Sequence, residues 1–422
     1  MSRSDRAVWR LWRWRPGGLA RDGARIFLGL GLRAAAQAAL VLLLARWLGA
    51  QGYGAFVAAL AMATFFTPLA GLGLAAVIVR DGSGGPSALA RLRRGALRLW
   101  AAASLASTAL AVGAIAWSLP APAPLAALAL LAAGEVAAAS LVEINARIEQ
   151  ARQRAMRFGL VMAGLPLARL LGLLVLLLAA SPPSPAAWMI AYGLSSVAYA
   201  ALLTVLQGAG WRHSRVSPPP PAGHLARDGL PFAAGALASR LQTEFNKPVL
   251  AHLSYADAGG FNVAQRLVDL VTLPLAALQE ALWPRVFAAP DPHARMRRSA
   301  AALLAVALAA AAVLVLFAPL LPRILGADYA PASHALAALA LLPALQVARN
   351  LGNAALMTRG QSRALLWVDA AAAVVGVLLT LLLVPRWGLS GAVWAAYGGM
   401  AAALAVLIGF LKRAKIERML GS

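Results

Sequence analysis

The sequence predicts an all-α membrane protein with about twelve transmembrane helices in two sets of six. Of its 422 residues, 61% are hydrophobic and only 13% are charged, and the mean hydropathy is +0.73. Soluble domains carry about twice that charged fraction. Twelve apolar runs are each about long enough to cross a bilayer, and basic residues recur in every second loop. An ordinary soluble globule is therefore excluded.

Residues 1–25 are expected to form a basic cytoplasmic segment that lies on the membrane surface. The segment holds seven arginines and three tryptophans, and it lacks the apolar core that a secretory signal requires. Tryptophan favours the membrane interface, and arginine favours anionic head groups. A basic tail that only keeps the terminus in the cytoplasm is the alternative interpretation.

The apolar runs divide the rest of the chain. The first lobe, 26–210, is predicted to contain spans at 26–47, 54–79, 96–119, 124–144, 158–180 and 186–207. A proline-rich cytoplasmic linker is predicted over 211–229. The second lobe, 230–411, is predicted to contain spans at 230–253, 258–283, 299–320, 332–357, 364–384 and 389–411, followed by a basic cytoplasmic tail at 412–422.

The distribution of basic residues tests this division independently. Alternate loops contain nearly all of them, at Arg80, Arg91, Arg93, Arg94, Arg147, Arg152, Arg154, Arg157, Arg212, Arg215, Arg227, Arg285, Arg295, Arg297, Arg298, Arg359 and Arg363. The remaining loops hold only Arg46, Arg323 and Arg386. Because cytoplasmic loops attract Lys and Arg, both termini are predicted to be cytoplasmic. The net charge of +23 therefore belongs to these loops and does not indicate nucleic acid.

An internal repeat supports two related halves. The stretch 45–76 passes through a glycine-rich corner to an apolar run that reaches Pro68, and 251–282 does the same and reaches Pro274. Repeated halves are a common architecture of transporters, with the substrate site at the interface between them.

No motif for an enzyme, a nucleotide or a metal is recognisable. The three lysines, Lys247, Lys412 and Lys415, do not stand in a P-loop, and the five histidines form no HExxH pattern. The chain has no cysteine, which excludes disulfides and thiolate metal sites. We therefore predict a protein that is not an enzyme and needs no cofactor.

Polar residues inside the predicted spans are the candidate site. Arg240, Glu244 and Lys247 recur at helical spacing and share one face of the seventh span. Similar polar stripes occur in the eighth and tenth spans. A charge in a membrane is costly unless it faces a partner or water, so each stripe is expected to face a cavity. Ion pairs that only hold the bundle together are the alternative.

Basic residues outnumber acidic ones in these stripes, which favours an anionic cargo, since guanidinium groups bind phosphate well. The candidate cavity residues are Arg33, Arg169, Arg240, Lys247, Arg266, Arg349 and Asn350. The candidate groups for a coupling H⁺ or Na⁺ are the carboxylates Glu244, Asp269 and Asp369.

Four segments carry a family resemblance. They read LARWLGAQGYGAFVAAL, GLPFAAGALASRL, GGFNVAQRLVDL followed by LPLAALQEALWPRV, and LGADYAPASHALAALAL. From about residue 26 to 411 the chain resembles the polysaccharide-exporting, O-antigen type flippases of the multidrug/oligosaccharidyl-lipid/polysaccharide (MOP) superfamily. Many relatives have an aspartate near the position of Asn246 and Lys247, so the coupling residue is left open.

The resemblance implies two six-helix lobes packed as a V around a cavity in the cell inner membrane. It implies alternating access, an ion gradient as driving force and a cargo such as a polyprenyl-diphosphate-linked oligosaccharide for lipopolysaccharide synthesis. Membrane lipids and polysaccharide assembly proteins are the implied partners.

Three alternatives remain open. A multidrug exporter of the same superfamily is expected to line its cavity with carboxylates and aromatics. A membrane glycosyltransferase or polymerase is expected to carry an acidic pair in a large outward loop, whereas Asp257 and Asp328 stand alone in short ones. A lipid II flippase is expected to have more spans or a more cationic first lobe.

Overall fold

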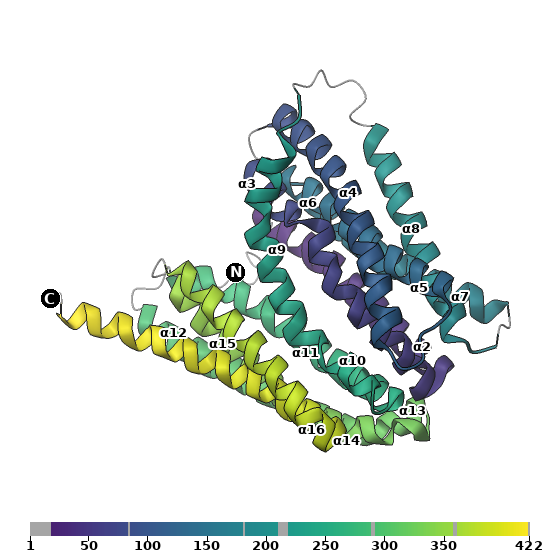
Figure 1. The fold of residues 1–422 in the computed structure, drawn as a ribbon. Helices are drawn as coiled ribbons and strands as arrows, with labels where there is room; N and C mark the ends of the chain where they lie inside the picture. Colours follow the sequence, from purple (N-terminus) through teal and green to yellow (C-terminus); the bar gives the residue numbers. More distant parts are fainter. Residues whose placement is uncertain are drawn as a thin grey trace, which may run out of the picture.

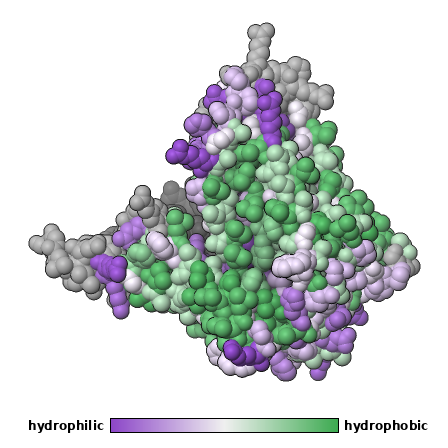
Figure 2. Space-filling view, viewed as in Figure 1, coloured by the Kyte–Doolittle hydropathy of each residue, from purple (hydrophilic) through white to green (hydrophobic). Residues whose placement is uncertain are grey.

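The computed structural model describes residues 18–82, 85–179, 182–209, 218–287, 292–357 and 361–420. Within these ranges the chain forms helices joined by short turns, and it contains no strand (Figure 1). The predicted all-α fold is confirmed. Figure 2 shows hydrophobic residues over much of the visible side of the molecule, with hydrophilic residues gathered toward its upper and lower edges. Such a belt is the surface that a bilayer requires.

The first half contains one bent helix, which crosses twice, and four further crossings. Its elements are α2 (Gly18–Gly71), α3 (Leu74–Asp81), α4 (Pro86–Ser118), α5 (Leu125–Ala132), the π-helix η2 (Ala133–Ala138), α6 (Ala139–Ala151), α7 (Ala155–Leu178) and α8 (Pro185–Ala209). The bend in α2 lies at Gly49, whose φ of 68° favours glycine. A second break falls at Leu72 and Gly73, where both φ values are positive, so the predicted span 54–79 is not continuous.

The second half repeats the pattern with more interruptions. Its elements are α9 (Ala222–Glu244), α10 (Asn246–Ala251), α11 (Tyr255–Phe287), α12 (Pro292–Phe317), η3 (Ala318–Leu320), α13 (Leu321–Leu325), η4 (Ala327–Tyr329), α14 (Ala330–Leu339), α15 (Leu342–Met357) and α16 (Ser362–Leu420). Helix α16 bends at Gly388, with a φ of 53°. Helix α9 begins inside the segment predicted to be linker.

The described helices provide twelve crossings. Eight stretches are long and apolar enough to span a membrane, and two of these, Gly31–Asp81 and Ala364–Arg413, turn back at their glycine bends and so cross twice. The α9–α10 pair and α11 supply the other two crossings, since their length suffices although they carry more charge. The chain is therefore a multi-pass membrane protein.

The two halves meet at the ends where the bends of α2 and α10–α11 lie, on the side opposite the basic loops. A Cβ atom added at Gly54 would lie 1.6 Å from the carbonyl oxygen of Tyr255, so the backbones of α2 and α11 touch here. Tyr53 accepts a 2.6 Å hydrogen bond from Asn262, and Tyr329 donates one of 2.9 Å to the Ala45 carbonyl. We call this contact the outer seal.

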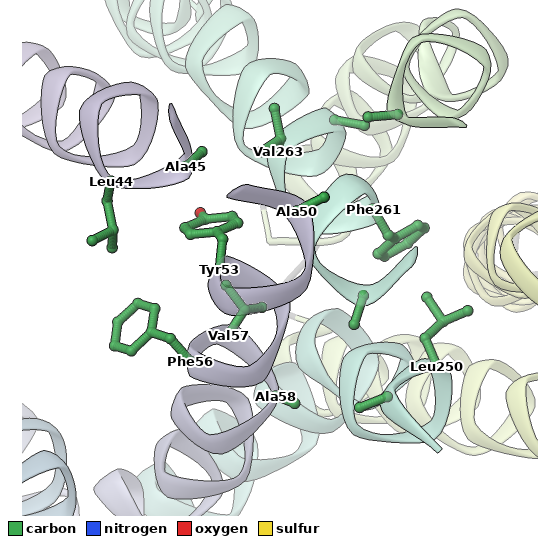
Figure 3. Close-up of a cluster of buried hydrophobic side chains, with 14 of the residues drawn as sticks. Leu44, Ala45, Ala50, Tyr53, Phe56, Val57, Ala58, Leu250, Phe261 and Val263 are labelled. Carbon is green, nitrogen blue, oxygen red and sulfur yellow. The ribbon is translucent and has the colours of Figure 1, made fainter. Parts of the chain in front are cut away.

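The outer seal is largely apolar. Figure 3 shows Tyr53, Phe56 and Val57 on α2, with Phe261 and Val263 of the second half nearby. All five side chains are almost completely buried. Packing of this kind, at native density, resists any added volume.

A smaller contact joins the halves at the basic end. Leu225 of α9 packs in a cluster with Leu74 and Ile78 of α3. Arg80 Nη2 also lies 2.7 Å from Asp228 Oδ2, and both side chains are about half exposed. The start of α9 is thus attached to the first half, while α9 also packs against α16 of the second.

Substitution of Gly54 by Ala is expected to loosen the outer seal. Overpacking at such a site costs about 1–3 kcal/mol, which shifts a two-state equilibrium about 5- to 150-fold. The cysteine-free chain allows an Ala50→Cys reporter, and its labelling by a membrane-impermeant maleimide should accelerate in Gly54→Ala. Gly31→Ala is the matched control, because a Cβ there meets nothing within 4 Å. Equal labelling rates in the two variants would contradict this account of the seal.

Candidate functional site

A charged cluster of the second half forms around Glu244, at the end of α9. Pro248 has no N–H to donate to the Glu244 carbonyl, and the helix breaks at Phe245 between α9 and α10. The Lys247 ammonium bonds directly to the Glu244 carboxylate, and both residues are buried. Arg266 Nη2 of α11 lies 3.5 Å from Glu244 Oε1, and Arg266 Nη1 lies 3.9 Å from Asp269 Oδ2.

A second cluster lies in the first half, around Glu135 of the π-helix. Arg169 Nη2 of α7 lies 2.9 Å from Glu135 Oε2 and also donates to the Gly134 carbonyl at 3.3 Å. Tyr192 of α8 donates a 2.5 Å hydrogen bond to the same carboxylate oxygen, and the Arg169 guanidinium stacks 4.0 Å from the Tyr192 ring. Arg169 Nε donates to Ser196 at 2.9 Å. Each charge in this cluster therefore has a partner.

The π-helix is what presents Glu135 to these partners. A π turn widens the helix by one residue and displaces carbonyl groups from the ordinary ladder, an arrangement frequent at functional sites. Here the Glu135 carbonyl accepts a 3.1 Å hydrogen bond from Thr67 of α2, and Thr64 Oγ1 lies 3.5 Å from Glu135 Oε1. The cluster thus joins α2, α7 and α8 through one widened turn.

Two arginines between the halves have no such partner. Arg33 of α2 and Arg240 of α9 make no side-chain hydrogen bond or ion pair within the described residues. They repel each other electrostatically, although Arg33 also feels the attraction of Glu143 and Glu135. At 1.5 Å per residue, Arg33 lies about 24 Å along the helix from the Gly49 bend, in the part of α2 nearer the basic loops. Arg240 is exposed and Arg33 is half-buried.

A third group of polar residues lies within the second half. Arg349 of α15 is ion-paired with Asp369 of α16, and its Nη1 lies 3.5 Å from Gln242 Oε1. Asn350 donates a 3.3 Å hydrogen bond to Gln279. A cavity of about 60 Å³ nearby is lined by neutral polar residues together with apolar ones. The polar lining consists of Gln242, Thr243, Asn246, Gln265, Gln346 and Thr380.

The predicted site residues therefore fall into distinct surroundings. Arg33 and Arg240 lie unpaired between the halves, Arg169 lies inside the first half, and Arg349, Asn350 and Asp369 lie inside the second. A network in the second half faces the first half, because the charge of Glu135 acts on Arg266. This network consists of Glu244, Lys247, Arg266 and Asp269. Glu135 was not among the candidate site residues. Its position in the middle of the apolar run 124–144, far from the other carboxylate of that run, Glu143 near the end, was a signal that could have identified it.

Comparison with known proteins agrees with this architecture. No family model and no curated protein matches the sequence. Among solved structures, several membrane transport proteins share the fold at low sequence identity. The chain is similar to the lipid II flippase MurJ in an inward closed conformation, with a TM-score of 0.75, 11% identity, and 92% of this chain and 87% of that chain covered.

Two multidrug resistance MATE family transporters are also similar. An inward-facing one gives a TM-score of 0.71 with 16% identity, covering 94% of this chain and 100% of that chain. An outward-facing one gives a TM-score of 0.63 with 17% identity, covering 94% and 96%. The helices thus superpose better on the inward-facing arrangement.

Breaking the Glu135–Arg169 pair from one side should be strongly destabilising. Glu135→Gln or Arg169→Gln alone leaves a largely buried charge, 14% exposed in the pair, without its counter-charge, which costs up to about 3–5 kcal/mol. The double variant should recover part of this loss in a thermal-unfolding double-mutant cycle in detergent. The exposed pair Glu143–Arg147, at 3.5 Å, is the control and should change stability by at most about 1 kcal/mol. Similar losses for Glu135→Gln and Glu143→Gln would contradict a structural role of the buried pair.

Proposed function

We propose that the protein moves a lipid-linked oligosaccharide, linked through a polyprenyl diphosphate, across the cell inner membrane for surface polysaccharide synthesis. The fold supports transport by analogy with the flippase and the exporters that it resembles. The observation that carries the anionic cargo is the pair of unpaired guanidinium groups, Arg33 and Arg240, contributed by opposite halves. A diphosphate supplies a direct counter-ion, which Glu143 and Glu244, acting only at a distance on Arg33 and Arg240, do not provide.

The choice of a diphosphate follows from charge and geometry. A guanidinium within a low-dielectric region is stable only beside an anion or water, and its planar donors suit phosphate oxygens. Arg33 and Arg240 are close enough to repel each other electrostatically, so one anion between them can interact with both. The sugar head enters between the halves in this proposal, while the polyprenyl chain stays in lipid.

Alternating access supplies the movement. The outer seal closes the route in the present arrangement, which is nearer the inward-facing relative than the outward-facing one. Delivery to the outer leaflet then requires the halves to separate at the seal and to approach at the basic end. Such a change is biased by cargo only if the cargo binds the two states differently.

Coupling to an ion gradient is proposed through the carboxylates of the second half. The side chain of Asp269 is 45% exposed and that of Glu244 7%, so Asp269 is the more accessible to H⁺ or Na⁺. An ion bound at Asp269 competes with Arg266 for the carboxylate, which links ion binding to the network between the halves. Asp369 is ion-paired with Arg349 inside the second half, so an ion bound there is linked less directly to the network between the halves.

Neutral substitutions of the unpaired arginines should abolish most transport without unfolding the protein. Arg33→Gln and Arg240→Gln should each reduce flipping of a fluorescent polyprenyl-diphosphate oligosaccharide in proteoliposomes at least tenfold, because each loses a charge-assisted contact worth about 1.5–3 kcal/mol. Arg98→Gln, which removes an exposed arginine of α4, is the control. Wild-type flipping by both variants would overturn the role of the arginine pair.

Multidrug export is the second candidate, because MATE transporters share the fold. The same proteoliposomes can be tested with cationic dyes, and a deletion strain can be tested for drug susceptibility. Cytoplasmic accumulation of lipid-linked sugar in that strain, with unchanged susceptibility, supports the flippase. Increased susceptibility with normal surface polysaccharide supports the exporter instead.

A covalent link across the outer seal should stop transport. Arg46 Nη1 donates a 2.5 Å hydrogen bond to the Ile324 carbonyl across the halves, and both residues are exposed. In the cysteine-free chain, an Arg46→Cys/Ile324→Cys variant treated with a short bis-maleimide should lose flipping almost completely. Each single-cysteine variant, treated in the same way, should remain active. Continued flipping by the cross-linked protein would contradict opening at this seal.

A further inference from the structure

A buried arginine of the first half has no role in the pathway between the halves. Arg93, Leu97 and Trp100 recur at i, i+4 and i+7, so they share one face of α4. Leu97 and Trp100 pack into the cluster that contains Ala200 and Leu203 of α8. Arg93 continues this face at the basic end of the helix, where it is only 9% exposed.

The charge of Arg93 is not compensated within the described part of the chain. Its Nε atom is buried and has no hydrogen-bond partner, and no ion pair includes its guanidinium. The charge that acts on it most is another cation, Arg152, whose own side chain lies 3.5 Å from Glu149. The segment 210–217 that follows α8 contains no acidic residue. A buried charge without a counter-ion is strongly unfavourable.

Space is available beside this guanidinium. Among the described residues, a Cβ atom added at Gly208, near the end of α8, would meet only Arg93 Nη2, at 3.9 Å. The neighbouring Gln207 has a buried Oε1 atom without a hydrogen-bond partner. Within the described part of the chain the space between Gly208 and Arg93 is therefore open, and we call it the gap; the side chain of any other residue at 208 would project into it.

We propose that this gap, between Arg93 and Gly208 and within the electrostatic range of Arg152, binds a phosphate group at the basic surface of the first half. A guanidinium donates two parallel hydrogen bonds to phosphate oxygens, and a phosphate neutralises the buried charge. The basic loops face the leaflet in which anionic lipids concentrate, so a phospholipid head group is one source and free phosphate is the other. Within the described residues, the main contacts of helix α8 are with elements of the first half, namely α2, α5, η2, α6 and α7, so the site is separate from the proposed cargo route (Figure 1).

The experiment measures thermal unfolding of the purified full-length protein in detergent with added phosphatidylglycerol, phosphatidylcholine or inorganic phosphate. Phosphatidylglycerol should raise the unfolding midpoint of the wild type by about 3–5 °C relative to phosphatidylcholine. Arg93→Gln should lose this increment, and Gly208→Leu should lose it too, because the leucine fills the gap while the charge remains. Arg94→Gln, at an exposed neighbouring position, is the matched control and should keep it.

The remaining outcomes are distinguishable. In phosphatidylcholine, Arg93→Gln should be at least as stable as the wild type, because an uncompensated buried charge has been removed. If it is equally destabilised in both lipids, Arg93 only supports the fold and the proposal is wrong. An equal loss in Arg93→Gln and Arg94→Gln indicates general surface attraction and also overturns it. An equal increment from millimolar inorganic phosphate supports the site and identifies free phosphate as its ligand.

Discussion

A charged side chain within the membrane needs an opposite charge or water, and this constraint organises the interior of the protein. Arg169, Arg266 and Arg349 satisfy it through carboxylates of the same half. Because its charge is already neutralised by a carboxylate, an arginine in such a pair is less able to bind an anionic ligand. Arg33 and Arg240 make no such pair within the described residues, and they repel each other across the two halves. The pairing pattern therefore separates arginines that hold a bundle together from those available to an anion.

The two contacts between the halves differ in kind. The outer seal consists mainly of small, aliphatic and aromatic residues, with a few neutral hydrogen bonds such as Asn262–Tyr53, and its strength comes from packing and apolar burial. The contact at the basic end relies partly on the Arg80–Asp228 pair, which is half exposed and of a type worth at most about 1 kcal/mol. A seal without buried ion pairs can separate without leaving charges uncompensated. This property suits a gate that has to open and close repeatedly.

Much of the fold was predictable, because the length of the apolar runs and the alternation of basic loops can both be read from the sequence. The positions at which the helices break were harder to predict. Pro248 marked the break after α9, and helical spacing placed Arg240, Glu244 and Lys247 on one face. In the structure Glu244 and Lys247 are buried, with Arg266 of α11 beside Glu244, whereas Arg240 is exposed. The partners of Glu135 come from α7 and α8, and the widened turn that presents it has no recognised pattern in the residues AGEVAA. Such contacts depend on tertiary packing, which periodicity does not encode.

The two proposed anion sites differ in one physical respect. Arg33 and Arg240 lie on different halves, so their separation changes whenever the halves move, and the affinity for an anion between them changes with it. Arg93, Arg152 and Gly208 all belong to the first half, so their mutual distances stay fixed during such a movement. Only a ligand whose affinity differs between two states can shift the equilibrium between them. The first site therefore has the property that a transported anion requires, whereas the second is suited to a phosphate that stays bound throughout the cycle.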